Sequence, residues 1–207
     1  MFEAPHRSDC VFALDPGDCD GPPRTVPVVS DLKTRLPALS AYAYERTRAR
    51  LEGMSDEEYL WEPVENCWTL RPTATGALRA DFAPRPEVEP FTTIAWRLWH
   101  LIGCYGGERN PRWLGVEVEA AGFDGADPAP GTAAEAISAL ERAHGLWQEV
   151  MAALPAERWR EKLGPIAGPY AEDDKAALVL HQIDEQIHHG AEIGVLRDLF
   201  RARSGPH

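Results

Sequence analysis

The amino-acid sequence predicts an all-α protein, a four-helix bundle that follows an irregular N-terminal arm. Four long segments repeat their apolar residues at helical spacing, and most of them open with a residue that can cap a helix. No segment of any length alternates apolar and polar residues as a half-buried strand does. The 207 residues suit one domain, so we expect an arm of residues 1–27 and a bundle of residues 28–207.

The arm should lack regular structure because it contains five prolines with glycine and aspartate between them. The first long helix is predicted over about residues 30–51, where Ser30 or Asp31 can cap its start. Pro37 lies inside this run and predicts either a kink or a later start of the helix. A capping box at residues 55–58 should then open one short turn.

Residues 61–91 contain five further prolines and are predicted to be mostly loop. We expect Trp61, Cys67 and Trp68 in this stretch to form a lid or plug over one end of the bundle. The second long helix follows at about residues 93–105. This helix is apolar nearly all round and should therefore be buried on most sides.

The third and fourth helices have clear starting signals. Thr132 can cap the third helix with Glu135 completing a capping box, and this helix should run to about residue 154. The fourth should begin near Asp173 or Asp174 and continue to about residue 203. Its acidic start and arginine-rich end both complement the helix dipole.

The charge of the chain excludes some classes of partner. The formal net charge is -12 and the pI is about 5.0, which argues against nucleic acid or an anionic membrane as the main partner. No apolar run reaches the length of a membrane span and no export signal is evident, so we expect a cytoplasmic protein. The four scattered cysteines should be free thiols: Cys10, Cys19, Cys67 and Cys104.

Three histidines and three acidic residues crowd one stretch of the fourth helix. These six residues lie between positions 181 and 192. Because successive residues of a helix are rotated by about 100°, most of the six lie on one face of the helix. An imidazole and a carboxylate one turn apart can bind the same ion. Three pairs have this spacing: His181 with Glu185, Asp184 with His188, and Glu185 with His189.

A leucine seam favours one of these pairs. Four residues repeat every seven positions along the helix: Leu178, Glu185, Glu192 and Leu199. A pocket inside a bundle needs polar positions flanked by such leucines, which favours Glu185 and His189 over Asp184 and His188. A solvated helix face would also carry these polar residues, but three histidines within nine residues argue against it.

His100 lies in the middle of the apolar second helix. Because an unpaired buried polar group costs roughly 1–3 kcal/mol, this histidine must have a partner. It could be a hydrogen-bonded core histidine, but together with the fourth helix a shared divalent ion explains it better. Two imidazoles and one carboxylate leave positions open on zinc or nickel, which is typical of a catalytic site.

Several segments resemble the DinB-like superfamily, which includes thiol-dependent S-transferases and mycothiol-dependent maleylpyruvate isomerases. The resemblance covers roughly residues 30–203. The segments that carry it are LWEPVENCW at 60–68, TIAWRLWH at 93–100, ERNPRWLG at 108–115 and IHHGAEIGVLRDL at 187–199.

This resemblance implies a metal site with one histidine on the second helix and a His/Glu-x-x-x-His pair on the last. The gap-free match places these ligands at His100, Glu185 and His189. Glutamate stands where a third histidine is commoner, and the isomerase branch looks similar in this respect. A register one residue earlier, with Asp184 and His188, is the alternative.

The activity implied by the resemblance is thiol chemistry at one divalent ion, zinc or nickel, with mycothiol as the possible co-substrate. The partners would be a small-molecule thiol and an electrophile, and the protein would be a monomer or homodimer. His181, His188 or Asp184 could orient ligands or act as a general base. Arg97 and Arg109 could pair with a substrate carboxylate, although we expect both at the solvated surface.

Two other functions fit the same residues. The bundle could bind a metal or small ligand in a stress response without catalysis, in which case it would lack a pocket beside the metal. It could also have lost the metal, in which case His100 would hydrogen-bond Glu185 directly and chelators would leave its stability unchanged.

Overall fold

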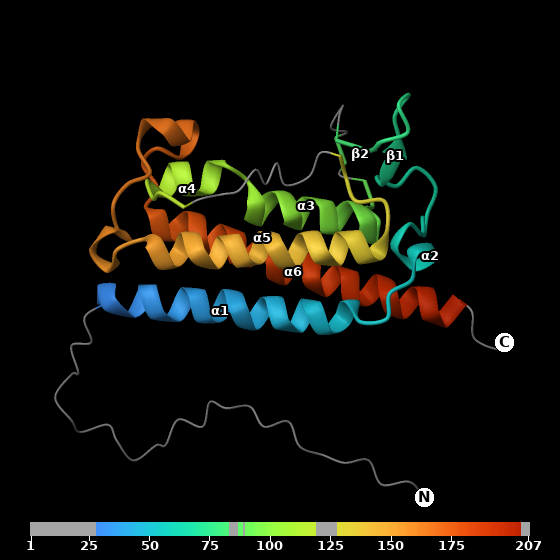
Figure 1. The fold of residues 1–207 in the computed structure, drawn as a ribbon, viewed down its shortest axis with the longest axis horizontal. Coiled ribbons are helices and arrows are strands. Elements are labelled where there is room, and N and C mark those ends of the chain that lie inside the picture. The colour runs from blue at the N-terminus through green and yellow to red at the C-terminus, as the bar shows by residue number, and fades with distance from the viewer. Residues whose placement is uncertain (1–27, 83–86, 89, 119–127, 204–207) are drawn as a thin grey trace, which may run out of the picture.

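Four long helices build the protein, as a computed structural model of the chain shows (Figure 1). The structure describes residues 28–82, 87, 88, 90–118 and 128–203. The long helices are α1 (Val28–Leu51), α3 (Ile94–Gly106), α5 (Ala133–Ala153) and α6 (Lys175–Arg203). Helices α1 and α3 each pack against both α5 and α6, which closes the bundle. The predicted all-α fold is confirmed, and the predicted arm lies outside the described residues.

Shorter elements cover the two ends of the bundle. They are α2 (Asp56–Tyr59), β1 (Leu70–Pro72), β2 (Leu78–Ala80), α4 (Arg109–Leu114), η1 (Ala156–Arg158) and η2 (Pro165–Tyr170). Figure 1 shows α2 and the strands at one end and α4 at the other. The strands pair antiparallel, with Leu70 opposite Ala80. The sequence prediction missed this hairpin because strands of three residues are too short to show alternation.

Helix α1 begins at Val28 and continues through Pro37, so the predicted later start and the capping at residues 30 or 31 are wrong. Pro37 cannot donate a hydrogen bond to the preceding turn. The tertiary contacts of α1 with α5 and α6 compensate for this loss. Lys33 Nζ adds a further link by donating to the Leu154 carbonyl, 2.9 Å away.

The turn at α2 forms only half of the predicted capping box. The Ser55 hydroxyl accepts from the Glu58 backbone N–H, 3.2 Å away. The Glu58 carboxylate instead accepts two hydrogen bonds from Arg197, from Nε at 2.7 Å and Nη2 at 3.0 Å. Both side chains are buried, so this ion pair ties α2 to the end of α6.

The predicted starts of the other helices are confirmed. Thr93 caps α3, and Thr132 with Glu135 forms the complete capping box of α5. At the start of α6, Asp174 accepts a hydrogen bond from the Ala177 backbone N–H. None of the helices in the described part of the chain combines the length and apolar character that crossing a membrane requires.

His144 lies in the aromatic core between α1, α3 and α5. Its ring stacks on Tyr44 at 3.8 Å between centroids and meets Tyr105 edge-on at 5.4 Å. Burial lowers the pKa of His144 to about 4, so the imidazole is neutral in the folded protein at neutral pH. Trp147, fully buried one turn further along α5, stacks against Tyr105.

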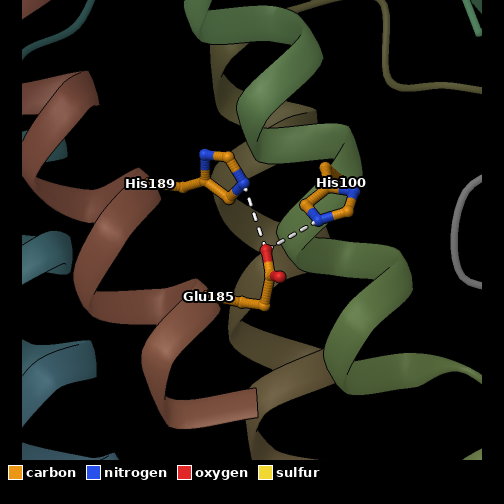
Figure 2. A group of neighbouring side chains, drawn as sticks. All are labelled: His100, Glu185 and His189. Atoms are coloured by element: carbon orange, nitrogen blue, oxygen red, sulfur yellow. Dashed lines mark hydrogen bonds and ion pairs between the residues drawn. The ribbon is translucent and has the colours of Figure 1, made fainter. Parts of the chain in front are cut away.

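The close approach of α1 and α6 fixes the rotation of α6. A Cβ atom on Gly190 would overlap the Thr47 hydroxyl, so any larger residue at this crossing would force the Thr47 side chain to move. The same hydroxyl accepts a hydrogen bond from Gln186 Nε2 at 2.5 Å. With Gln186 and Gly190 facing α1, the neighbouring positions Glu185 and His189 face α3 (Figure 2).

Candidate metal centre

Three side chains from two helices point toward one another at the centre of the α3–α6 interface (Figure 2). Glu185 Oε2 lies 3.0 Å from His100 Nε2 and 3.2 Å from His189 Nε2. The two imidazole rings meet edge-on at 4.9 Å between centroids. One donor atom from each residue lies within 4.8 Å of the other two, so the three side chains could hold one ion.

The donor set fits a divalent transition metal. Bond lengths of about 2.0–2.1 Å in a tetrahedral zinc site place ligand atoms about 3.3 Å apart, close to the two contacts of Glu185. Trp96 stacks on His100 with the rings 8° from parallel and 5.2 Å between centroids. This stacking holds the His100 ring in the orientation that aims Nε2 at Glu185.

The electrostatics of the cluster favour a cation. Hydrogen bonds from His100 and His189 hold the pKa of Glu185 well below its ordinary value, so its carboxylate is charged. Burial lowers the pKa of His100, but hydrogen bonds with Cys104 and Glu185 outweigh it and raise the pKa to about 9. A metal ion would therefore replace a proton on this ring.

A second carboxylate holds the far side of the His189 ring. Glu192 Oε2 lies 2.7 Å from His189 Nδ1 and accepts a hydrogen bond of 2.7 Å from Arg97 Nε. Despite burial, these two contacts lower the pKa of Glu192 to about 2. A carboxylate on the outer nitrogen of a ligating histidine fixes the tautomer and makes the inner nitrogen a better donor.

Arg97 is not at the solvated surface, contrary to the sequence prediction. It is 6% exposed, and besides the Glu192 contact its Nη1 donates to the Thr92 carbonyl at 2.5 Å. These contacts commit its guanidinium to holding Glu192. Arg109 is exposed, as predicted, and lies at α4.

The alternative ligands lie at the margin of the cluster. Asp184 and His188 are exposed and do not join His100 in a ligand group within the described part of the chain. His181 is exposed, with Nε2 3.7 Å from Glu185 Oε1. The geometry therefore brings His100, Glu185 and His189 together. It does not bring Asp184 and His188, the ligands of the alternative register, close to His100.

A second group of possible donors overlaps the first: His188, His189 and Glu192. His188 Nε2 lies 3.3 Å from Glu192 Oε1. Because Arg97 already binds the Glu192 carboxylate, its positive charge disfavours a metal ion at this second position.

Cys104 lies beside the cluster but outside the ligand group. Its Sγ atom is 3.4 Å from His100 Nε2, and the thiol is buried and free. Cys67 is also buried and free, as the sequence predicted for both. The other two cysteines lie outside the described residues.

The cluster forms one wall of a pocket of about 480 Å³, which we call the metal-site pocket. Its apolar side is formed by Trp68, Phe82 and Trp96, and its polar side by Asp184, Glu185, His188, His189 and Glu192. Trp68 comes from the segment predicted to form a lid or plug, and from the same segment Trp61 packs against Phe200 near the end of α6, 5.5 Å away between ring centroids. No pattern in the sequence indicated Phe82, which follows β2 and lines the pocket.

Fold and site together define an all-helical bundle with a histidine–carboxylate centre open to a pocket. The chain belongs to the DinB superfamily, whose family model matches residues 41–193. This match starts in α1 and ends in α6, so it includes all three candidate ligands. Neither a search of curated proteins nor a search of solved structures found a match.

Proposed function

We propose that this protein binds one divalent metal ion, zinc or nickel, through His100, Glu185 and His189 and uses it in a thiol-dependent transfer or isomerisation reaction. The observation that carries this proposal is the convergence of the three donor atoms on one wall of the metal-site pocket. Superfamily membership supports it, since this superfamily includes metal-binding enzymes.

The bound ion would lower the pKa of a thiol that reaches its open coordination position. The chain itself would supply the surroundings. Trp68 and Trp96 offer an apolar wall for the electrophile, next to the ligands. In a transfer reaction the thiol loses its proton, its sulfur bonds to carbon, and the leaving group departs with the electron pair of its broken bond.

His188 is our candidate for the proton acceptor. It lines the metal-site pocket, and its exposed ring can exchange a proton with solvent. Asp184 lines the same pocket and is the alternative acceptor. His181 lies on the other side of Glu185 and could orient that ligand.

The remaining features of the proposal rest on the resemblance to thiol-dependent members of the superfamily and on the composition of the chain. The co-substrate would be a low-molecular-weight thiol such as mycothiol, and the protein would act in the cytoplasm as a monomer or homodimer. The net charge of -12 supports partners other than nucleic acid or membrane.

A rate measurement with metal-loaded protein tests the proposed activity. Zinc- and nickel-loaded samples are mixed with cysteine, glutathione or mycothiol and with monochlorobimane, which releases chloride as the fluorescent thioether forms. We expect a rate above that of His100→Ala with at least one thiol. Equal rates for both proteins with every thiol, although wild type holds its metal, would favour the non-catalytic metal-binding bundle.

A further inference from the structure

A second hollow of about 280 Å³ lies between α4, η2 and the first turns of α6. We call it the α4 pocket. The lining residues that matter here are Arg109, Trp113, Leu163, Tyr170, Asp173 and His181. None of these except His181 belongs to the metal centre or its surroundings.

The α4 pocket has aromatic sides and a buried apolar floor. The rings of Trp113 and Tyr170 lie 6.2 Å apart between centroids, and Tyr170 is 57% exposed. Leu163 and Leu178 are buried beneath them. Trp113 is partly buried. Large rings on a concave surface are a typical feature of small-molecule sites, because they offer contact area at little entropic cost.

Two opposite charges accompany these rings. The Arg109 guanidinium lies 5.7 Å from the centre of the Trp113 ring, and Asp173 also lines the pocket. Among the described residues, the ion pairs nearby join Arg160 to Asp174 and Lys175 to Glu161, and no ion pair there involves Arg109 or Asp173. A ligand group of the opposite charge could therefore bind to each of them.

The backbone around the α4 pocket is held in place without a ligand. Asn110 is fully buried; its Nδ2 donates to the Cys104 carbonyl at 2.7 Å, and its Oδ1 accepts from Gln182 at 3.3 Å. These bonds tie α4 to α3 and α6. Across the pocket, the Leu163 N–H donates to the Asp173 carbonyl at 2.8 Å. A preformed site loses less entropy on binding than a flexible one.

His181 connects the α4 pocket with the metal centre. Its side chain lines the α4 pocket, and its Nε2 lies 3.7 Å from Glu185 Oε1. Glu185 itself lines the metal-site pocket. His181 therefore lies between the α4 pocket and Glu185, and two molecules that bind in the two pockets would approach each other near this pair.

We infer that the α4 pocket binds the sulfur-free part of the thiol co-substrate. The matching ligand is a small hydrophilic thiol with a carboxylate for Arg109, an ammonium or hydroxyl donor for Asp173, and a C–H-rich face for the two rings. Glutathione offers all three features, whereas mycothiol has hydroxyl groups but no carboxylate for Arg109. Its sulfur would point past His181 toward Glu185, while the electrophile occupies the metal-site pocket. The ligand class rests on the proposed function, but the pocket is defined without the metal.

The experiment uses metal-free protein and S-methylglutathione, whose capped sulfur cannot act as a thiolate. Isothermal titration calorimetry compares wild type with Arg109→Gln and Trp113→Leu. The matched control is Arg112→Gln, an exposed arginine of the same short helix that does not line the pocket. We expect Arg109→Gln to weaken binding about tenfold or more, and Arg112→Gln to bind like wild type.

A chemical control distinguishes a specific contact between Arg109 and a ligand carboxylate from nonspecific binding. The dimethyl ester of S-methylglutathione lacks both carboxylates, so wild type and Arg109→Gln should bind it equally weakly. Absence of binding to wild type at millimolar concentration, or equal affinity of Arg109→Gln and wild type for the acid, would overturn the inference. Binding of the probe by a protein that takes up no zinc or nickel would support the α4 pocket while refuting the proposed metal-dependent function.

Discussion

Glu192 should set the metal affinity of the centre although it is not one of the three proposed ligands. It contacts His189 Nδ1 at 2.7 Å and is itself held by Arg97. Replacing such an outer partner of a ligating histidine typically costs about 10- to 100-fold in metal affinity, or about 1.4–2.7 kcal/mol. Glu192→Gln keeps the shape and one acceptor oxygen, so we expect the lower end of this range.

One effect opposes this loss. The Glu192 carboxylate also raises the pKa of His189. Removing this carboxylate would therefore weaken the binding of the proton that competes with the metal for His189. An ion of charge +2 gains more from a nearby carboxylate than a proton of charge +1 does. The net result of Glu192→Gln should therefore still be weaker metal binding.

The assay is a zinc titration against a chromophoric chelator at fixed pH, with thermal unfolding of the metal-free proteins measured in parallel. Asp184→Asn is the matched control, because it removes the same charge from the same pocket without a contact to His189. A zinc affinity of Glu192→Gln equal to that of Asp184→Asn would refute the role of Glu192. A larger loss in Asp184→Asn would instead favour the ligand register one residue earlier.

Three further predictions concern the frame of the site. Gly190→Ala should destabilise the fold by about 1–3 kcal/mol in urea unfolding, because the added methyl group overlaps Thr47 at the α1–α6 crossing. Arg197→Met should cost about 3–5 kcal/mol in the same assay, because it leaves the buried Glu58 carboxylate without its cation. For His144, the folded pKa of about 4 lies below the ordinary 6.5, so the unfolded chain binds the proton more readily between these values. Stability attributable to His144 should therefore fall as pH drops from 6.5 to 4, by up to about 3 kcal/mol, as measured by urea unfolding across this range.

Each of these predictions has a matched control. Gly145→Ala adds a methyl group at an exposed helical glycine with open space around it, and should stabilise α5 by up to about 1 kcal/mol. Adding Glu58→Leu to Arg197→Met should recover much of the lost stability, since no unpaired charge then remains. His144→Phe keeps a ring against Tyr44 and should flatten the pH dependence; an unchanged slope would contradict our assignment to His144.

Local signals predicted the long helices well. The caps at Thr93 and Thr132 involve residues within one helical turn of each other, so the sequence carries the whole interaction. Pro37 misled the prediction because propensity describes an isolated helix, whereas α1 is held by its neighbours. The hairpin of β1 and β2 has too few residues to show a pattern at all.

The candidate ligands on α6 were predictable because they share one face of a single helix. Periodicity favoured Glu185 and His189, and both indeed face His100. The leucine seam used for that choice is incomplete, since Leu178 is buried but Leu199 is half exposed. Whether these residues bind a metal remains a prediction.

Other parts of the site depend on contacts between distant segments. The sequence shows Arg97 and Glu192 on separate helices, and nothing in either segment indicates that their side chains meet. Phe82 reaches the metal-site pocket from the segment after β2, where no regular spacing guides prediction. Likewise, Tyr170 meets Trp113 only because η2 folds back toward α4.

Metal content tests the central claim most directly. Wild type and His100→Ala, purified without an affinity tag, are analysed by inductively coupled plasma mass spectrometry before and after addition of zinc or nickel. We predict one equivalent of metal in wild type, lost in His100→Ala while circular dichroism shows that the helices remain. A wild-type protein that contains no metal and takes up neither ion, or a His100→Ala variant with full occupancy, would contradict the proposed centre.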